Sequence, residues 1–114
     1  MSDCLFCKIA RKEMSGSIVY EDDDLMAFKD IQPQAPVHIL VIPKRHISGA
    51  MAATAGDAAI LGRMILLSKI LAERFSVSEC GFRLVVNSGV DAGQAVAHLH
   101  MHFLGGRKLK WPPG

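Results

Sequence analysis

The chain lacks the features of membrane-spanning, secreted or strongly charged proteins. No apolar run approaches the roughly 18 residues of a membrane helix, and the first residues, MSDCLFCKIARKEM, contain no apolar signal-peptide core. Three cysteines are an odd number, which argues against a disulfide framework. A net charge of +2 provides no overall attraction for nucleic acid or membrane. We therefore expect a cytoplasmic protein that has neither of them as a partner.

The spacing of apolar residues predicts a single α+β domain over residues 1–114, without repeats or linkers. A short amphipathic helix is expected over 4–14 and a long helix over 57–75. Strands are expected over 18–22, 25–31, 38–44, 82–89 and 97–106. Short turns between the strands, with the helices grouped apart, predict an antiparallel sheet of about five strands. The buried stripe predicted for the long helix comprises Leu61, Met64, Ile65, Ser68, Leu71, Ala72 and Phe75.

Three of the five histidines lie within five residues, in the stretch AHLHMHFLGG over 97–106. A step of two residues rotates a helical side chain by about 200°, which would scatter His98, His100 and His102 around a helix. On a strand the same spacing places them on one face, and the apolar residues between them point the other way. Those apolar neighbours and the two glycines that follow favour the strand. The segment therefore predicts a row of imidazoles opposite the core.

Two chemical roles fit such a row. The outer Cα atoms of a strand of this length lie about 13 Å apart, whereas ligand nitrogens lie about 2 Å from zinc, so a catalytic metal bound by all three rings is disfavoured. A neutral imidazole with a pKa of about 6.5 is a competent nucleophile. The central ring, His100, has a neighbour on either side to orient it and to move protons.

The preceding segment, NSGVDAGQAVAH over 87–98, provides groups that bind an anion. It contains an asparagine, a glycine turn and backbone N–H groups that can face an oxyanion. Neither a Walker A motif nor a Rossmann fingerprint is present. Attack by histidine on a phosphorus centre fits these parts, but they do not identify the substrate.

The stretch HLHMHFL matches His-φ-His-φ-His-φ-φ, where φ is apolar, and resembles the signature of the histidine triad superfamily. The segments IVYEDDDLMAFKDIQPQAPVHILVIPKRHIS, GFRLVVNSG and GGRKLKWPPG resemble its Hint branch, the purine nucleoside phosphoramidases, over nearly the whole chain. The resemblance implies hydrolysis of the P–N bond in purine nucleoside 5′-monophosphoramidates through a nucleotidyl-histidine intermediate. It also implies that catalysis needs no cofactor and that the sheet continues across a homodimer.

The same resemblance implies roles for individual residues. His100 aligns with the nucleophile, His98 and His102 with its flanking partners, and His38 with a further histidine that supports the site. Asn87, Gly93 and Ala95 match residues that contact the phosphate and ribose, and Asp30 matches the carboxylate that binds the ribose hydroxyls. Trp111 would lie in the C-terminal tail, which reaches toward the partner's site. The apolar slot for the purine would comprise Leu5, Phe6, Ile9, Met14, Phe28, Ile31 and Leu40.

The chain departs from the Hint pattern in two places. Ala95 and Ala97 stand where the branch usually has a serine and an aromatic residue, and 15–17, SGS, replaces a turn that contains proline. The hydroxyl lost at Ala95 would contact phosphate or help to protonate the leaving amine, so binding should survive better than rate. Two other functions therefore stay open. One is a nucleotide-binding interaction protein with incidental turnover, and the other is a dinucleoside polyphosphate hydrolase, against which the ending WPPG argues.

Cys4 and Cys7 form a C-x2-C pair, whose spacing suits a chelated metal. Such a pair on an apolar helix is also compatible with two small buried hydrophobes. The resemblance to many prokaryotic histidine triad proteins implies a structural zinc bound by these cysteines together with His46 and His98. The usual Hint proteins lack both cysteines. Cys80 is interpreted as a packing residue.

Overall fold

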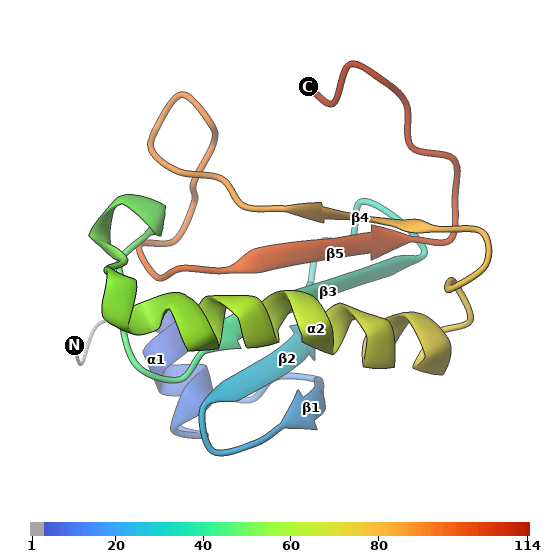
Figure 1. The fold of residues 1–114 in the computed structure, drawn as a ribbon. Helices are drawn as coiled ribbons and strands as arrows, with labels where there is room; N and C mark the ends of the chain where they lie inside the picture. The colour runs from blue at the N-terminus through green and yellow to red at the C-terminus, as the bar shows by residue number, and fades with distance from the viewer. Residues whose placement is uncertain (1–3) are drawn as a thin grey trace.

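The computed structural model describes residues 4–114 (Figure 1). Its helices and strands follow the predicted order, and two short 3-10 turns, Ala50–Ala52 and Ala55–Asp57, precede the long helix. The elements are α1 Leu5–Ala10, β1 Ile18–Glu21, β2 Leu25–Lys29, β3 Val37–Pro43, α2 Ala58–Arg74, β4 Phe82–Val85 and β5 Met101–Gly105. Among these residues, no helix combines the length and the apolar character that crossing a membrane requires.

The strands form one antiparallel sheet in the order β1-β2-β3-β5-β4. The predicted α+β class, with five strands, one long helix and one short helix, is confirmed. The register of β3 against β5 pairs His38 with Leu104 and Leu40 with His102. His38 and His102, which are 64 residues apart in the sequence, are thereby brought together at the centre of the sheet. Continuation of the sheet across a homodimer stays a prediction.

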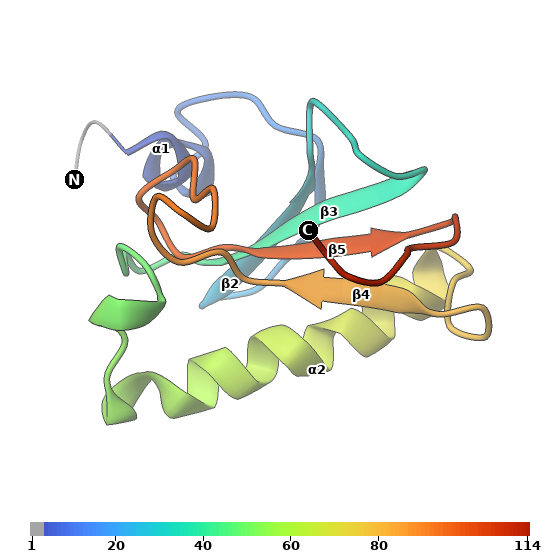
Figure 2. The ribbon, with the colours of Figure 1, turned by 90° about the horizontal axis from the view of Figure 1, so that it is seen from above.

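The helices cover opposite faces of the sheet (Figure 2). On the α2 face, Leu99, Met101 and Phe103 pack with residues of β2, β3 and the helix. On the other face, Phe6 and Ile9 of α1 pack with a smaller apolar cluster from β2 and β3. The alternation predicted for the histidine segment is therefore correct for its apolar residues. The row of histidines lies on the face that α1 partly covers.

The histidine segment differs from the prediction in where its strand begins. Only Met101–Gly105 is strand, so His98 and His100 precede β5. Pro43 at the end of β3 has no N–H with which to continue the ladder. The N–H of Leu99 instead donates to the carbonyl of Ile47 at 2.6 Å. The chain is thereby drawn towards the loop after β3.

The buried stripe of α2 also differs in part. Met64, Ser68, Leu71 and Ala72 are buried as predicted. Leu67, which the prediction omitted, is buried as well, whereas Ile65 is 57% exposed. The long helix is apolar over more of its circumference than one sheet face can cover, so periodicity alone did not fix which apolar residues face inward.

Candidate functional site

The three histidines before and within the start of β5 lie in different environments. His98 is fully buried, His100 is nearly so and His102 is partly exposed. The ring of Phe6 from α1 meets His100 edge-on, with the ring centroids 5.1 Å apart. The rings of His100 and His102 are also 5.1 Å apart. Burial of the central imidazole under an aromatic ring limits its contact with water.

Hydrogen bonds fix which nitrogen of His100 carries its proton. Nδ1 of His100 is 2.7 Å from the carbonyl oxygen of His98. A carbonyl only accepts, so Nδ1 of His100 is the protonated nitrogen. In the neutral ring, Nε2 then holds a free lone pair, which is the form of imidazole that attacks an electrophile.

His98 has both ring nitrogens engaged. Its Nε2 donates to the carbonyl oxygen of Pro43 at 2.8 Å, which leaves Nδ1 without a proton. That nitrogen faces Cys4 Sγ at 3.3 Å and Cys7 Sγ at 3.5 Å. Burial is the main cause that lowers the pKa of His98, and a positive charge on His46 or His100 would lower it further. Both nitrogens of the His98 imidazole are thus engaged with Pro43 and the cysteines, and its carbonyl accepts the Nδ1–H of His100.

A second chain of hydrogen bonds orders His38 and His102. The backbone N–H of Gln34 donates to His38 Nδ1 at 3.0 Å, so neutral His38 carries its proton on Nε2. That N–H donates to Nδ1 of His102 at 2.9 Å. His102 in turn carries its own proton on Nε2. Burial lowers the pKa of both histidines, which favours these neutral forms at neutral pH.

Asp30 adjoins this chain beside the buried His38. Its Oδ2 lies 3.4 Å from His38 Nε2, and its Oδ1 accepts the N–H of Gln32 at 2.8 Å. Asp30, His38 and His102 together resemble a metal cluster in residue type. Their hydrogen bonds argue against that role, because the Nε2 of His38 is a donor. Nitrogens 2.9 Å apart are also closer than the roughly 3.3 Å that two ligands on tetrahedral zinc require, given Zn–N bonds of about 2.0–2.1 Å.

The structure gathers part of the predicted purine slot. Phe6, Ile9, Phe28 and Leu40 belong to one buried cluster beside the histidines. Leu5 and Met14 are exposed, and Ile31 is 95% exposed in the turn after β2. Trp111 is 80% exposed in the C-terminal tail. The nucleotide-contacting roles of all these residues stay predictions.

The glycine-rich segment between β4 and β5 forms a closed loop. Gly93 has a φ of 82°, which glycine adopts without strain. Its N–H donates to Val90 O at 3.1 Å and is thus already used within the loop. The phosphate-contacting roles of Gly93, Ala95 and Asn87 stay predictions.

Gln94 is a residue that the sequence reasoning missed. Its amide nitrogen donates to the carbonyls of Ser48 and Val96, and its amide oxygen accepts the N–H of Gly89. It therefore joins both ends of the glycine-rich loop to the loop after β3. A glutamine between a glycine and an alanine was the only sequence signal, and it does not reveal these partners.

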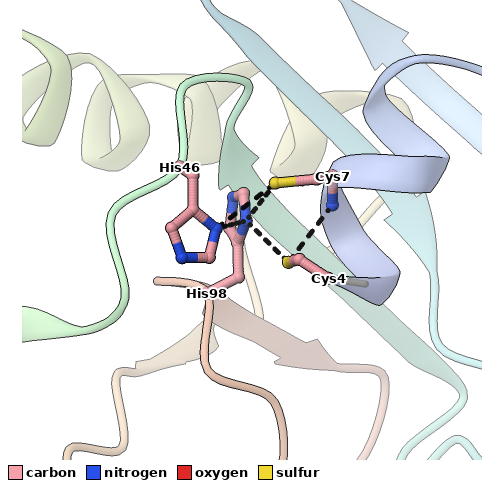
Figure 3. Close-up of side chains that lie close together, drawn as sticks. All are labelled: Cys4, Cys7, His46 and His98. Carbon is pink, nitrogen blue, oxygen red and sulfur yellow. Dashed lines mark hydrogen bonds between the residues drawn. The ribbon is translucent and has the colours of Figure 1, made fainter. Parts of the chain in front are cut away.

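The C-x2-C pair lies at the start of α1 (Figure 3). Cys4 is the N-cap and its sulfur accepts the N–H of Cys7, so both sulfurs lie at one end of the helix. They face His46 from the loop after β3 and His98 from the segment before β5. Burial is the first cause that raises the pKa of the Cys7 thiol, followed by its contact with Cys4.

The donor atoms of this cluster fit a zinc ion. The two Nδ1 atoms of His46 and His98 are 3.2 Å apart, and Cys7 Sγ is 3.3 Å from the Nδ1 of His46. Zinc with Zn–N bonds of about 2.0–2.1 Å and Zn–S bonds of about 2.3 Å has tetrahedral edges of roughly 3.3–3.8 Å. The observed separations are close to these edges. The Pro43 carbonyl, as acceptor from His98 Nε2, also supplies the orienting contact that metal-bound histidines usually have.

Comparisons with known proteins agree with this geometry. The family model described as HIT domain matches residues 11–109, and the chain belongs to this family. The 14 kDa zinc-binding protein of Brassica juncea is 46% identical over 98% of this chain and 100% of its own length. Adenylylsulfatase HINT1 of Arabidopsis thaliana is 44% identical over 99% of this chain and 78% of its length.

A solved structure gives the same result for the fold. The HIT family hydrolase from Legionella pneumophila superposes with a TM-score of 0.96 at 46% identity and covers 98% of this chain and 100% of its own. Within the HIT family the chain is Hint-like, as its resemblance to the Hint branch predicted.

Proposed function

We propose that the chain is a hydrolase that cleaves the P–N bond of purine nucleoside 5′-monophosphoramidates through a nucleotide covalently bound to His100. The observation that carries the proposal is the hydrogen bond from His100 Nδ1 to the His98 carbonyl. It holds the ring in the tautomer whose Nε2 lone pair is free. Histidine nucleophiles transfer phosphorus groups through such a nitrogen. The resemblance of HLHMHFL to the triad signature supports the same assignment.

The proposed reaction has two steps. Nε2 of His100 attacks the phosphorus and forms an N–P bond while the bond to the amine breaks. The leaving amine takes a proton, for which the Nε2–H of His102 is our candidate donor. Water then attacks the phosphorus of the nucleotidyl-histidine and gives up a proton that restores the Nε2–H of His102, while the N–P bond breaks to release the nucleoside monophosphate and free His100. Separating the two steps lowers each barrier relative to direct attack by water.

The residues around the triad would bind the nucleotide. We assign the purine to the apolar side chains near Phe6 and Phe28, the ribose hydroxyls to Asp30, and the phosphate to Asn87 and the amide of Ala95. A carboxylate is a strong acceptor for two hydroxyl donors. Because the relative from Arabidopsis thaliana is named an adenylylsulfatase, adenosine 5′-phosphosulfate is a second candidate substrate. In that case the bond that breaks is P–O, and sulfate leaves.

A turnover assay tests the proposal. Purified protein is given adenosine 5′-monophosphoramidate, adenosine 5′-phosphosulfate and a dinucleoside polyphosphate in parallel, and release of AMP is measured. His100→Asn should abolish turnover and still bind AMP, because the proposed binding contacts lie elsewhere. Near wild-type turnover by that variant would exclude His100 as nucleophile. AMP binding by the wild type without turnover of any substrate would favour a nucleotide-binding interaction protein.

We further propose that Cys4, Cys7, His46 and His98 hold a structural zinc. The four donor atoms lie within 4.8 Å of one another, and the zinc-binding relative supports the assignment. Four protein ligands leave no open position for substrate, so bound zinc would stabilise the attachment of α1 and supply no chemistry to the reaction.

We also propose that two copies join into a homodimer. The outer edge of β4 has no neighbouring strand in the sheet order. Beside it, Ile65 and Val86 expose apolar surface, and they line a cavity of about 330 Å³ between α2 and the sheet. A second chain placed edge to edge would bury this surface and continue the sheet.

A further inference from the structure

The carboxylate of Asp30 has spare acceptor capacity next to the buried end of the His38–His102 chain. Its Oδ1 accepts one N–H, from Gln32. Its Oδ2 is 3.4 Å from the Nε2 of His38, whose side chain is almost fully buried. Two carboxylate oxygens offer about four acceptor sites. Asp30 is only partly buried, so its remaining sites can accept donors that arrive from solvent.

The Nε2 proton of His38 has two acceptors near it. It donates to His102 Nδ1 at 2.9 Å, and Oδ2 of Asp30 is 3.4 Å from the same His38 Nε2. One N–H cannot be well aligned with both. The negative charge of Asp30 attracts the proton, which opposes the dominant effect of burial on the pKa of His38 and His102. Asp30 thus competes with His102 for the proton that orders the pair.

We propose that Asp30 is a positioning residue that links an occupied ribose site to the order of the triad, a role that rests on the proposed function. Ribose hydroxyls that donate to Asp30 spread its negative charge and weaken its attraction for the His38 N–H. That N–H then donates fully to His102, which is held with its proton on Nε2. The proton donor for the leaving amine is therefore best ordered when a nucleoside is bound, and the ribose hydroxyls contribute to kcat as well as to binding.

Kinetics on paired substrates test this role. Adenosine 5′-monophosphoramidate and its 2′,3′-dideoxy analogue are compared with the wild type, Asp30→Asn and the control Asp23→Asn. Asp23 is an exposed carboxylate in the turn between β1 and β2. Loss of the hydroxyls should lower kcat about tenfold in the wild type and in the control. In Asp30→Asn the same loss should change kcat by less than about twofold.

The inference would be overturned if removal of the ribose hydroxyls changed KM alone. If loss of the hydroxyls raises KM and leaves kcat unchanged in the wild type, Asp30 only binds the sugar. Equal losses of kcat in the wild type and in Asp30→Asn would also overturn it, because the effect of the hydroxyls would not pass through this carboxylate.

Nitrogen NMR of the imidazoles gives a readout that does not depend on turnover. The ¹⁵N resonances of His38 and His102 are assigned with His38→Gln and His102→Gln and followed while AMP or 2′,3′-dideoxy-AMP is added at saturation. AMP should shift both histidines further than the dideoxy nucleotide does, and Asp30→Asn should remove that difference. Equal shifts with both nucleotides would refute the inference and leave the nucleotide site intact. Failure of AMP to bind would refute the proposed nucleotide site and this inference with it.

Discussion

Removal of the two cysteines of the proposed zinc site should lower stability through the loss of metal. In Cys4→Ser with Cys7→Ser, the serine hydroxyls stay protonated at neutral pH and replace two thiolates that would bind zinc. The helix α1 would then be held to the sheet only by its apolar contacts, chiefly those of Phe6 and Ile9. Cys80, predicted from the sequence to be a packing residue, is instead exposed, and Cys80→Ser provides the control.

The magnitude follows from mass action. Free zinc at 100 times its dissociation constant stabilises the folded chain by about 2.7 kcal/mol. For a chain of 114 residues, 1 kcal/mol corresponds to roughly 4 °C in the unfolding temperature. A chelator should therefore lower Tm by about 10 °C in the wild type and in Cys80→Ser. The serine at the buried position 7 costs further stability through its hydroxyl, but that part is insensitive to chelator.

Scanning calorimetry with and without chelator separates the two effects. The double variant should unfold at a lower temperature than the wild type and should not respond to chelator. Elemental analysis of wild type that has been purified without chelator should find about one zinc per chain. A zinc content below about a tenth of an equivalent, or a wild-type Tm that chelator leaves unchanged, would return both cysteines to the role of packing residues.

Three further outcomes follow from the structure. Ala95→Ser should raise kcat by more than it lowers KM, because the added hydroxyl can assist the leaving group. Steady-state kinetics with the phosphoramidate measure both constants, and a fall in kcat would contradict this expectation. Burial lowers the pKa of His38 and His102, so the unfolded chain binds more protons and the free energy of unfolding should fall as pH drops below about 6.5. In zinc-free protein, His38→Gln with His102→Gln should make the denaturant midpoint depend less on pH over that range. An unchanged pH dependence would exclude this cause. Ile65→Asp with Val86→Asp should convert a dimer into a monomer in sedimentation experiments, whereas a wild type that is monomeric at micromolar concentration would refute the homodimer.

The sequence predicted much of the fold because its strands are short, apolar and separated by turn residues. The turn before β2 is an example, because Asp22 Oδ1 accepts the N–H groups of Asp24 and Leu25 and so stabilises a turn that the aspartates predicted. The start of β5 was predicted too early because alternation reports which face a residue occupies and does not report pairing. Pairing there stops at a proline on the neighbouring strand, which lies 55 residues away from His98.

The candidate site was predictable by residue type and not by connection. Spacing made His100 the candidate nucleophile, the C-x2-C pair suggested a metal site, and the family resemblance added His46 and His98 to it. The protonated nitrogen of each histidine, however, depends on backbone groups such as Pro43 O and Gln34 N–H, to which no motif points. The role of Gln94 in closing its loop depends in the same way on Ser48 O.

His98 shows how the two sites are joined and what its substitution would measure. Its imidazole lies between the Pro43 carbonyl and the two thiols, with neither nitrogen free for a substrate. Its carbonyl, in contrast, fixes the protonated Nδ1 of His100. A change of the His98 side chain therefore keeps the group that contacts His100 and removes the contacts that hold this carbonyl in place. We therefore expect a loss of rate in such a variant to report a displaced backbone, which would link the proposed nucleophile to the proposed metal site through the position of one peptide oxygen.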